Sequence, residues 1–455
     1  MEENNRLGVT PLPKLMLQMA VPAVVAQIIN VLYNIVDRIY IGHIQGVGSA
    51  ALTGVGVTFP IITMITAFSN IVGSGGAPLS AIWMGKGVKE YAGKIMGTGV
   101  AMLLFFAACL MAVFYIFKVP FLYLFGASDA TIGHGNSYLS IYLGGTVFVL
   151  LALGLNPYII AQGKPKAAMG SVLLGAALNI ALDPLFIFVF GWGVAGAAIA
   201  TVISQFFSAL WVILFLTGKK ADLALKWSDI RMDFRIIRRI AALGVAPFVM
   251  MFTDSLISII LNRGLQIYGG DLYVGSLTIM QSVMQLYTVP LNGFTQGIQP
   301  IISFNYGRGD FDRVKRTYRA MIGLSFCLMF GVALAAVLFP EPLAKVFTTD
   351  QELIRLVGKV MPVFMFGMLF FGLQNGIQPT FVGLGQAKLS LTIAILRKIV
   401  LLIPLALILP LHFGVMGVYY AEPISDILSV TVAVILFLTN IRKILSRESL
   451  GKIRQ

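Results

Sequence analysis

Apolar runs separated by short polar breaks constrain this chain more than any other feature. A helix needs about 20 mostly apolar residues to cross the hydrocarbon core of a bilayer. Twelve such runs follow one another, at residues 14–41, 50–82, 91–117, 134–161, 166–190, 194–217, 240–264, 273–303, 317–340, 355–382, 389–410 and 414–438. The sequence therefore predicts an all-α integral membrane protein with twelve transmembrane helices.

The composition indicates the same class. Only 11% of the 455 residues are charged and 58% are hydrophobic, whereas a soluble domain carries about 25% charged residues. So few charges cannot cover a globule that faces water, which excludes a soluble enzyme, a disordered chain and a secreted disulfide scaffold. Cys109 and Cys327 both lie inside apolar runs, so we expect two unreactive core thiols rather than a disulfide.

Lys and Arg are distributed unequally between the two sides that twelve spans create. If the N-terminus lies inside, 25 of the 33 basic residues fall on the inner side and six on the outer side. Basic residues mark cytoplasmic loops in membrane proteins. The pattern predicts a plasma (inner) membrane protein with both termini in the cytoplasm. The net charge of +14 then reflects topology, and nucleic acid is not expected as a partner.

The two halves of the sequence repeat each other at an offset of 221 to 225 residues. The matched positions are Pro22 with Pro247, Pro78 with Pro300, Gly163 with Gly385, and Gly193 with Gly414. Several matches at one offset indicate duplication, and six spans in each half give both halves the same orientation. We predict an N-terminal six-helix lobe at 1–217, a cytoplasmic linker at 218–239 and a C-terminal six-helix lobe at 240–455, with a substrate site between the lobes.

Motifs for catalysis or ATP hydrolysis are missing from the sequence. It contains neither GxxxxGK[ST] nor HExxH, and its three histidines fall at predicted outer loops. No grouping of a nucleophile with a base supports a membrane-embedded enzyme. The two-lobed pattern instead predicts transport by alternating access, without a cofactor.

Polar residues inside the spans of the first half are the strongest functional signal, because charges are costly at membrane depth. Asp37, Asn179, Asp183 and Thr201 fall at similar depth in spans one, five and six, counted at 1.5 Å per helical residue. Hard oxygen ligands suit Na⁺, and two neighbouring carboxylates can instead share a proton. The alternative to a functional role for Asp37 is that it lies near the membrane interface and forms an ion pair with its neighbour Arg38.

The second half carries a different set of charges. Asp254 lies near the middle of span seven, where it can attract a cation into a central cavity with Met251, Met280, Gln281 and Met284, or be held by a neighbouring helix. Flexible thioethers suit binders of varied ligands. Spans eleven and twelve also hold Arg397, Lys398, Glu422 and Asp426. For these four we predict a structural role, with Arg397 and Asp426 as an intramembrane pair.

At these residues the chain resembles the MATE (multidrug and toxic compound extrusion) family, prokaryotic branch, over nearly its whole length. The features that carry the resemblance are Pro22 before Asp37, Asn179-x3-Asp183-Pro184, Gly193-Val194-x-Gly196-Ala197-Ala198-x3-Thr201, and Gln299-Pro300-x5-Tyr306-Gly307. The resemblance implies two lobes in a V and export of organic cations in exchange for H⁺ or Na⁺. It places the coupling cation at Asp37, Asn179, Asp183 and Thr201, and the bend of the first helix at Pro22.

The resemblance also implies small-molecule substrates, a lipid environment and a monomer. In span ten the chain departs from members that have a second-lobe acid, since Gln374, Asn375 and Gln378 stand there instead. The alternative within the same superfamily is a flippase for lipid-linked oligosaccharides, which is expected to have a basic cavity. A major-facilitator transporter also has two six-helix halves, but its charged signature after span two is replaced here by WMGKGVKEYAGK.

Overall fold

Every one of the twelve apolar runs forms a helix or a bent pair of helices in the computed structural model, which describes residues 6–446. The first half contains α1 (Arg6–Val9), α2 (Leu12–Gly42), α3 (Gly48–Gly56), α4 (Phe59–Gly85), α5 (Lys89–Leu124), α6 (Ile132–Gly144), α7 (Thr146–Ala161), α8 (Pro165–Pro184), η1 (Leu185–Val189) and α9 (Gly193–Thr217). A short turn, η2 (Trp227–Asp229), lies in the segment that leads to the second half.

The second half repeats this plan. It contains α10 (Phe234–Tyr268), α11 (Asp271–Arg308), α12 (Phe311–Leu338), α13 (Pro340–Phe347), α14 (Gln351–Met365), α15 (Met368–Gly383), α16 (Ala387–Ile395), η3 (Leu396–Leu402), α17 (Ile403–Phe413) and α18 (Val415–Ile444). Within residues 6–446, nine helical segments are long and apolar enough to span a membrane, or eleven with the bent pairs α6–α7 and α14–α15. The remaining predicted span falls on α11, whose 38 residues include many polar side chains.

Glycines with positive φ occupy matching turns in the two halves. Gly163 and Gly385 have φ of 77° and 71°, in the turns that follow α7 and α15. Gly193 and Gly414 have φ of 54° and 57°, where α9 and α18 begin. A side chain is strained in this region of φ, whereas glycine is not. The sequence repeat is therefore also a repeat of backbone geometry at the ends of the helices.

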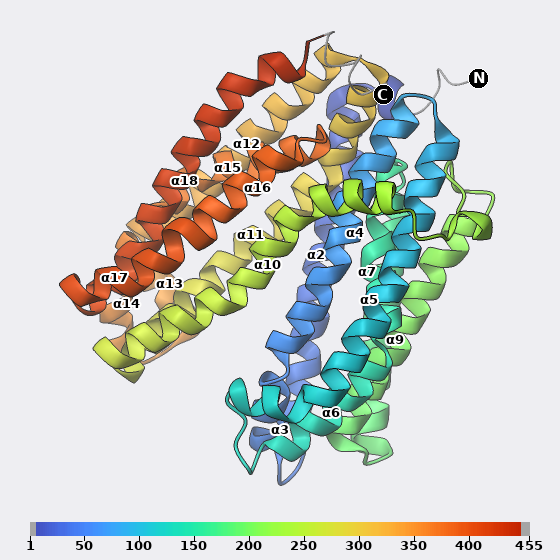
Figure 1. Ribbon diagram of the computed structural model, residues 1–455. Helices are drawn as coiled ribbons and strands as arrows, with labels where there is room; N and C mark the ends of the chain where they lie inside the picture. The colour runs from blue at the N-terminus through green and yellow to red at the C-terminus, as the bar shows by residue number, and fades with distance from the viewer. Residues whose placement is uncertain (1–5, 447–455) are drawn as a thin grey trace.

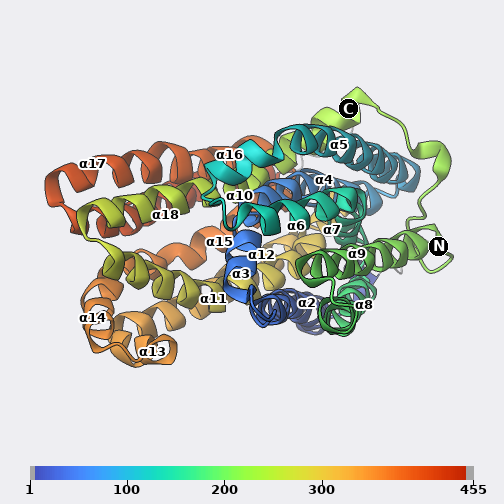
Figure 2. The same ribbon diagram turned by 90° about the horizontal axis from the view of Figure 1, so that it is seen from below.

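The helices form two groups that meet at one end and separate at the other (Figure 1). The end where the groups meet, called here the closed end, lies at the top of Figure 1 and carries the start of α2 and the end of α18. At the other end, α3 and α6 lie apart from α13, α14 and α17. Seen from below, α5, α7, α8 and α9 lie on one side and α13, α14, α17 and α18 on the other (Figure 2). Two helices of the first half connect it to the second group: α2 packs against α11, and α4 packs against α10.

Four glycines allow backbones of the two groups to touch near the closed end. We call Gly75, Gly85, Gly244 and Gly307 the glycine seam. A Cβ atom added at any of them would collide with the backbone of the opposite half, at Ile240, Phe304, Ile71 and Ile82 respectively. Small residues let membrane helices approach closely. The seam therefore fixes how near α4 comes to α10 and α11.

Buried apolar residues form two clusters that follow this arrangement. One runs through the first half and continues into the segments of α11, α12 and α18 near the closed end, and the other lies within residues 257–430 of the second half. Many large apolar side chains remain on the outer surface, as a lipid-covered protein requires. Cys109 and Cys327 are free and exposed. The expectation of core thiols was wrong, because an apolar run in a membrane helix can face lipid as well as the core.

Candidate functional site

A cluster of polar side chains lies inside the first half, where α8 packs against both α2 and α9. Asp37 of α2 is 7% exposed, and Asn179 and Asp183 of α8 are 2% and 0% exposed. Residues four apart lie on one face of a helix, so Asn179 reaches Asp183 Oδ1 with its Nδ2 at 3.3 Å. The same Nδ2 lies 3.4 Å from Oγ1 of Thr201 on α9. The structure thus brings all four predicted residues together.

Oxygen atoms in this cluster have spare capacity for a cation. The carboxyl groups of Asp37 and Asp183 face each other within interaction distance. Within residues 6–446, Asp37 Oδ1, Asn179 Oδ1 and Asp183 Oδ2 are buried and accept no hydrogen bond. Burying an unpaired carboxylate is costly, so the arrangement requires a positive charge between the two acids. A proton shared by the carboxyls or a small cation with oxygen ligands can supply it.

Within residues 6–446, neither acid forms a salt bridge with a base. Arg38 holds its guanidinium over the ring of Phe59, 4.2 Å from the centroid, and acts on the neighbouring Asp37 only through longer-range electrostatics. Tyr138 of α6 is 4% exposed, and its side chain reaches Thr201. Sequence reasoning missed Tyr138, because a tyrosine in a membrane helix gives no signal until the helix that it faces is known.

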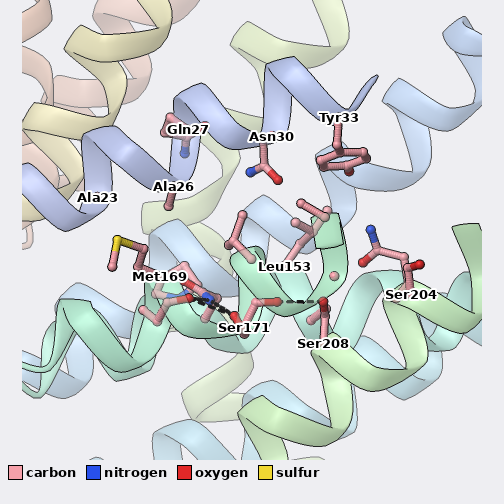
Figure 3. Close-up of a pocket in the computed structure, with 18 of the residues that line it drawn as sticks. Ala23, Ala26, Gln27, Asn30, Tyr33, Leu153, Met169, Ser171, Ser204 and Ser208 are labelled. Atoms are coloured by element: carbon pink, nitrogen blue, oxygen red, sulfur yellow. Dashed lines mark hydrogen bonds between the residues drawn. The ribbon is translucent and has the colours of Figure 1, made fainter. Parts of the chain in front are cut away.

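A small pocket adjoins the cluster on the side toward the closed end. It has a volume of about 90 Å³ and lies between α2, α7, α8 and α9. Figure 3 shows Gln27, Asn30 and Tyr33 of α2 on one wall, facing Ser171 and Ser208. The Ser208 hydroxyl donates to the carbonyl of Ser171 at 2.9 Å. At about 30 Å³ of liquid volume for each water, the pocket has room for roughly three, next to Asn179 and Thr201.

Five ionisable side chains of α10, η3 and α18 form two adjoining groups in the second half. Arg397 donates to Oδ1 of Asp426 from Nε at 2.8 Å and from Nη2 at 2.7 Å, and Nη2 also lies 3.2 Å from Glu422 Oε1. Lys398 Nζ lies 2.5 Å from Asp254 Oδ1. The Arg397 guanidinium also stacks over the Phe371 ring, 4.1 Å from the centroid. The predicted pair of Arg397 with Asp426 is present, and Asp254 is held by a neighbouring helix.

A larger cavity of about 680 Å³ opens between the two halves. Its walls come from α4 of the first half and from α10, α11, α15, η3 and α18 of the second. Of the residues predicted for this cavity, Asp254, Gln281 and Met284 line it. Met280 instead lies fully buried in the core of the second half, and the Met251 sulfur accepts from Asn70 at 3.0 Å. The prediction was wrong for Met280, since spacing along a helix gives depth but not direction, and for Met251 it stays a prediction.

A comparison with protein families decides what kind of protein has this architecture. The sequence profile of the MatE family matches residues 22–185 and 247–408, one segment in each half. The chain belongs to the MATE family. The family consists of transporters and not enzymes, which confirms the conclusion drawn from the missing catalytic motifs.

Relatives of this MATE protein match along nearly their full length. The multidrug export protein MepA of Staphylococcus haemolyticus (strain JCSC1435) is 26% identical over 422 residues, which cover 91% of this chain and 90% of the relative. MepA of Staphylococcus aureus (strain MRSA252) is 25% identical over 437 residues, with 94% of each chain covered. The solved outward-facing structure of a multidrug resistance MATE transporter superposes with a TM-score of 0.88 at 22% identity, over 96% of this chain and 98% of that one. The fold is thus that of a multi-pass MATE membrane protein.

The resemblance to MATE proteins also concerned Pro22 in α2 and the polar residues of α15. Pro22 lies inside the uninterrupted helix α2, so its role as a bend remains a prediction. In α15, Gln374 is buried and accepts from Ser429, while Asn375 lines the central cavity. Because α15 contains no acid, the carboxylates that line the cavity come from other helices, Asp254 from α10 and Glu422 from α18.

Proposed function

We propose that this MATE protein is a multidrug efflux antiporter of the plasma membrane, which exports organic cations and amphipathic drugs in exchange for H⁺ or Na⁺. Both termini lie in the cytoplasm, the monomer is the working unit, and lobes 1–217 and 240–455 move about the linker 218–239. The observation that carries the proposal is the pair of buried acids, Asp37 and Asp183, which among residues 6–446 have free oxygen atoms and no salt bridge to a base. The MepA relatives at about 25% identity support the class of cargo.

The coupling cation binds at the first-half cluster, because a positive charge there removes the cost of two buried carboxylates. Entry from outside is driven by the membrane potential, which contributes about 2.3 kcal/mol for each charge and each 100 mV. Release to the cytoplasm restores the charged pair. A cation that binds one state of the cluster better than the other shifts the balance between those states by its difference in affinity.

Helix α2 links the cluster to the junction between the halves. It carries Asp37 near one end, and near the other it packs against α11, where Gly293 and Gly297 allow close approach. Between these points, Gln27 Nε2 donates to Gln296 Oε1 of α11 at 3.1 Å. A change in the packing of α2 around Asp37 therefore alters the contacts between α2 and α11 where the two halves meet, as coupled alternating access requires.

The test measures ethidium export in everted membrane vesicles that contain the full chain, with a pH gradient and a Na⁺ gradient imposed separately. We expect one gradient to drive export, and Asp37→Asn and Asp183→Asn each to abolish the driven part. Asp312→Asn is the matched control, because its side chain is 83% exposed and far from the cluster. Full driven export in both cluster variants would contradict the proposed coupling site.

The flippase alternative receives less support from the charges of the central cavity. A carrier for a pyrophosphate-linked lipid requires free basic groups, whereas Arg397 and Lys398 are both engaged by carboxylates. Movement of a lipid-linked oligosaccharide by vesicles that fail to move ethidium would reverse this assignment.

A further inference from the structure

Charges in the second-half network do not balance. It contains three carboxylates, of Asp254, Glu422 and Asp426, and two bases, Arg397 and Lys398. If all five are ionised, one negative charge is left over. In the group with two acids and one base, Asp426 Oδ2 is buried and accepts no hydrogen bond from any of residues 6–446. Uncompensated charge in a site of low dielectric attracts a counter-ion strongly.

Asp254 and Lys398 form an ion pair at the cavity wall, and their side chains differ in exposed fraction. The Lys398 side chain is only 8% exposed, whereas that of Asp254 is 61% exposed. Both residues line the cavity of about 680 Å³. A solute in the cavity therefore reaches the carboxylate of Asp254 directly, while the stem of Lys398 remains packed in the protein.

The local helix geometry separates the roles of the two consecutive bases. Arg397 and Lys398 lie in η3, a π-helical segment that packs between α10 and α18. Neighbouring residues on a helix point in different directions, so Arg397 reaches α18 and Lys398 reaches α10. Arg397 is fixed by two acids and a ring, whereas among residues 6–446 Lys398 has one carboxylate partner, which is open to the cavity.

We propose that Lys398 is a built-in counter-ion for Asp254, which the cationic group of a substrate replaces, and that the network thereby selects substrates carrying a single positive charge. The inference rests on the proposed function, in which the central cavity takes organic cations, and it adds the charge number and the residue that sets it. With Lys398 present, one positive charge balances the network. Without Lys398 two positive charges are needed.

The remaining walls fit a flat organic cation. Phe59, Phe371 and Met284 provide apolar surface, with Arg38 over one face of Phe59 and Arg397 over one face of Phe371, and the amide of Gln281 provides a polar group. The volume falls within the range of about 300–1,000 Å³ that is usual for small-molecule pockets. Aromatic faces attract cations, and thioethers adapt to ligands of different shape. The walls therefore accept varied ring systems, while the net charge of the network favours ligands with one positive charge.

The test compares two dyes with the same phenanthridinium ring, ethidium with one positive charge and propidium with two. Their binding to the purified full-length protein in lipid nanodiscs is measured by fluorescence titration, without any ion gradient. We expect the wild type to bind ethidium more tightly than propidium. Lys398→Met keeps the apolar stem and should move the ratio of the two dissociation constants toward propidium by about tenfold or more. Lys398→Arg should restore the wild-type ratio.

Lys315→Met is the matched control, because it removes an exposed lysine that is paired with Asp312 at 3.6 Å, away from the cavity. If Lys398→Met does not fold, Asp254→Asn provides the second test, and it should weaken ethidium binding by about tenfold. An unchanged dye ratio in Lys398→Met, or unchanged ethidium binding in Asp254→Asn, overturns the proposal even if vesicles export ethidium. A wild type that neither binds nor exports ethidium overturns the proposed function as well.

Discussion

The glycine seam makes a direct prediction about the closed end. Replacing Gly307 with Ala places a Cβ atom 2.7 Å from the carbonyl carbon of Ile82, and nearer still to its oxygen. Replacing Gly85 with Ala places one 2.9 Å from the carbonyl carbon of Phe304. Ordinary contact between carbon atoms needs about 3.5–4.0 Å. Since both obstacles are backbone atoms, neither collision can be relieved by turning a side chain, and α4 must move away from α11.

The expected cost follows from these contacts. Overfilling a packed site costs about 1–3 kcal/mol. The roughly 0.5–1 kcal/mol that Ala gains over Gly within a helix is the same in both arrangements of the halves and cancels. The penalty on the closed arrangement is then about 1–3 kcal/mol, and each 1.4 kcal/mol changes an equilibrium constant about tenfold. We expect Gly307→Ala to shift the balance between closed and separated arrangements by about five- to 150-fold. Gly323 and Gly331 of α12 have no atom within 4 Å of an added Cβ, so alanine there should be neutral or stabilising.

The measurement is the distance between spin labels on the two halves near the closed end. Cysteines replacing Lys89 of α5 and Arg316 of α12 provide exposed sites, in a background without the free thiols Cys109 and Cys327. We expect Gly307→Ala to increase the population with long distances, and Gly323→Ala to leave the distribution unchanged. Identical distributions in the two variants would refute the argument that backbone contact at the seam holds the halves together.

Two further predictions concern stability and surface. Replacing Arg397 with Met leaves Glu422 and Asp426 buried without their cation, so the free energy of unfolding in SDS-containing mixed micelles should fall by about 3–5 kcal/mol; a loss below about 1 kcal/mol would contradict the buried pairing. Cys109 and Cys327 are exposed in the middle of apolar helices and should face lipid. A charged methanethiosulfonate reagent added on either side of the membrane should therefore modify neither thiol. Labelling of either one would show that it faces water.

Features that depend on one helix, or on the repeat, could be predicted from the sequence. Length and hydropathy locate the spans, and the paired glycines Gly163 with Gly385 and Gly193 with Gly414 mark equivalent turns because only glycine adopts their φ without strain. The first-half cluster could also be predicted, because Asn179 and Asp183 are four residues apart on one helix face and their depth matches that of Asp37.

Features that depend on the direction of a side chain around its helix could not be predicted. Depth follows from counting residues, but which neighbour a residue faces depends on packing between helices. Asp254 and Lys398 are 144 positions apart and still form an ion pair. Met280 and Met284 are one turn apart, yet the first is buried in the core while the second lines the cavity. The seam was missed for the same reason, since a glycine in a membrane helix is informative only once its partner helix is known.

The duplicated halves differ most in where their positive charge comes from. In the first half, neither Asp37 nor Asp183 forms an ion pair with a Lys or Arg of residues 6–446, and in the proposed mechanism their charge is balanced by an ion that arrives from water. In the second half, Arg397 and Lys398 supply most of the balance from within the protein. A small coupling ion and a bulky organic cation place opposite demands on a site. The first needs a tight group of bare oxygen atoms, and the second needs a wide cavity that remains tolerable when empty. Helices α2 and α4 pack against α11 and α10, so in the proposed mechanism these helices connect the two sites.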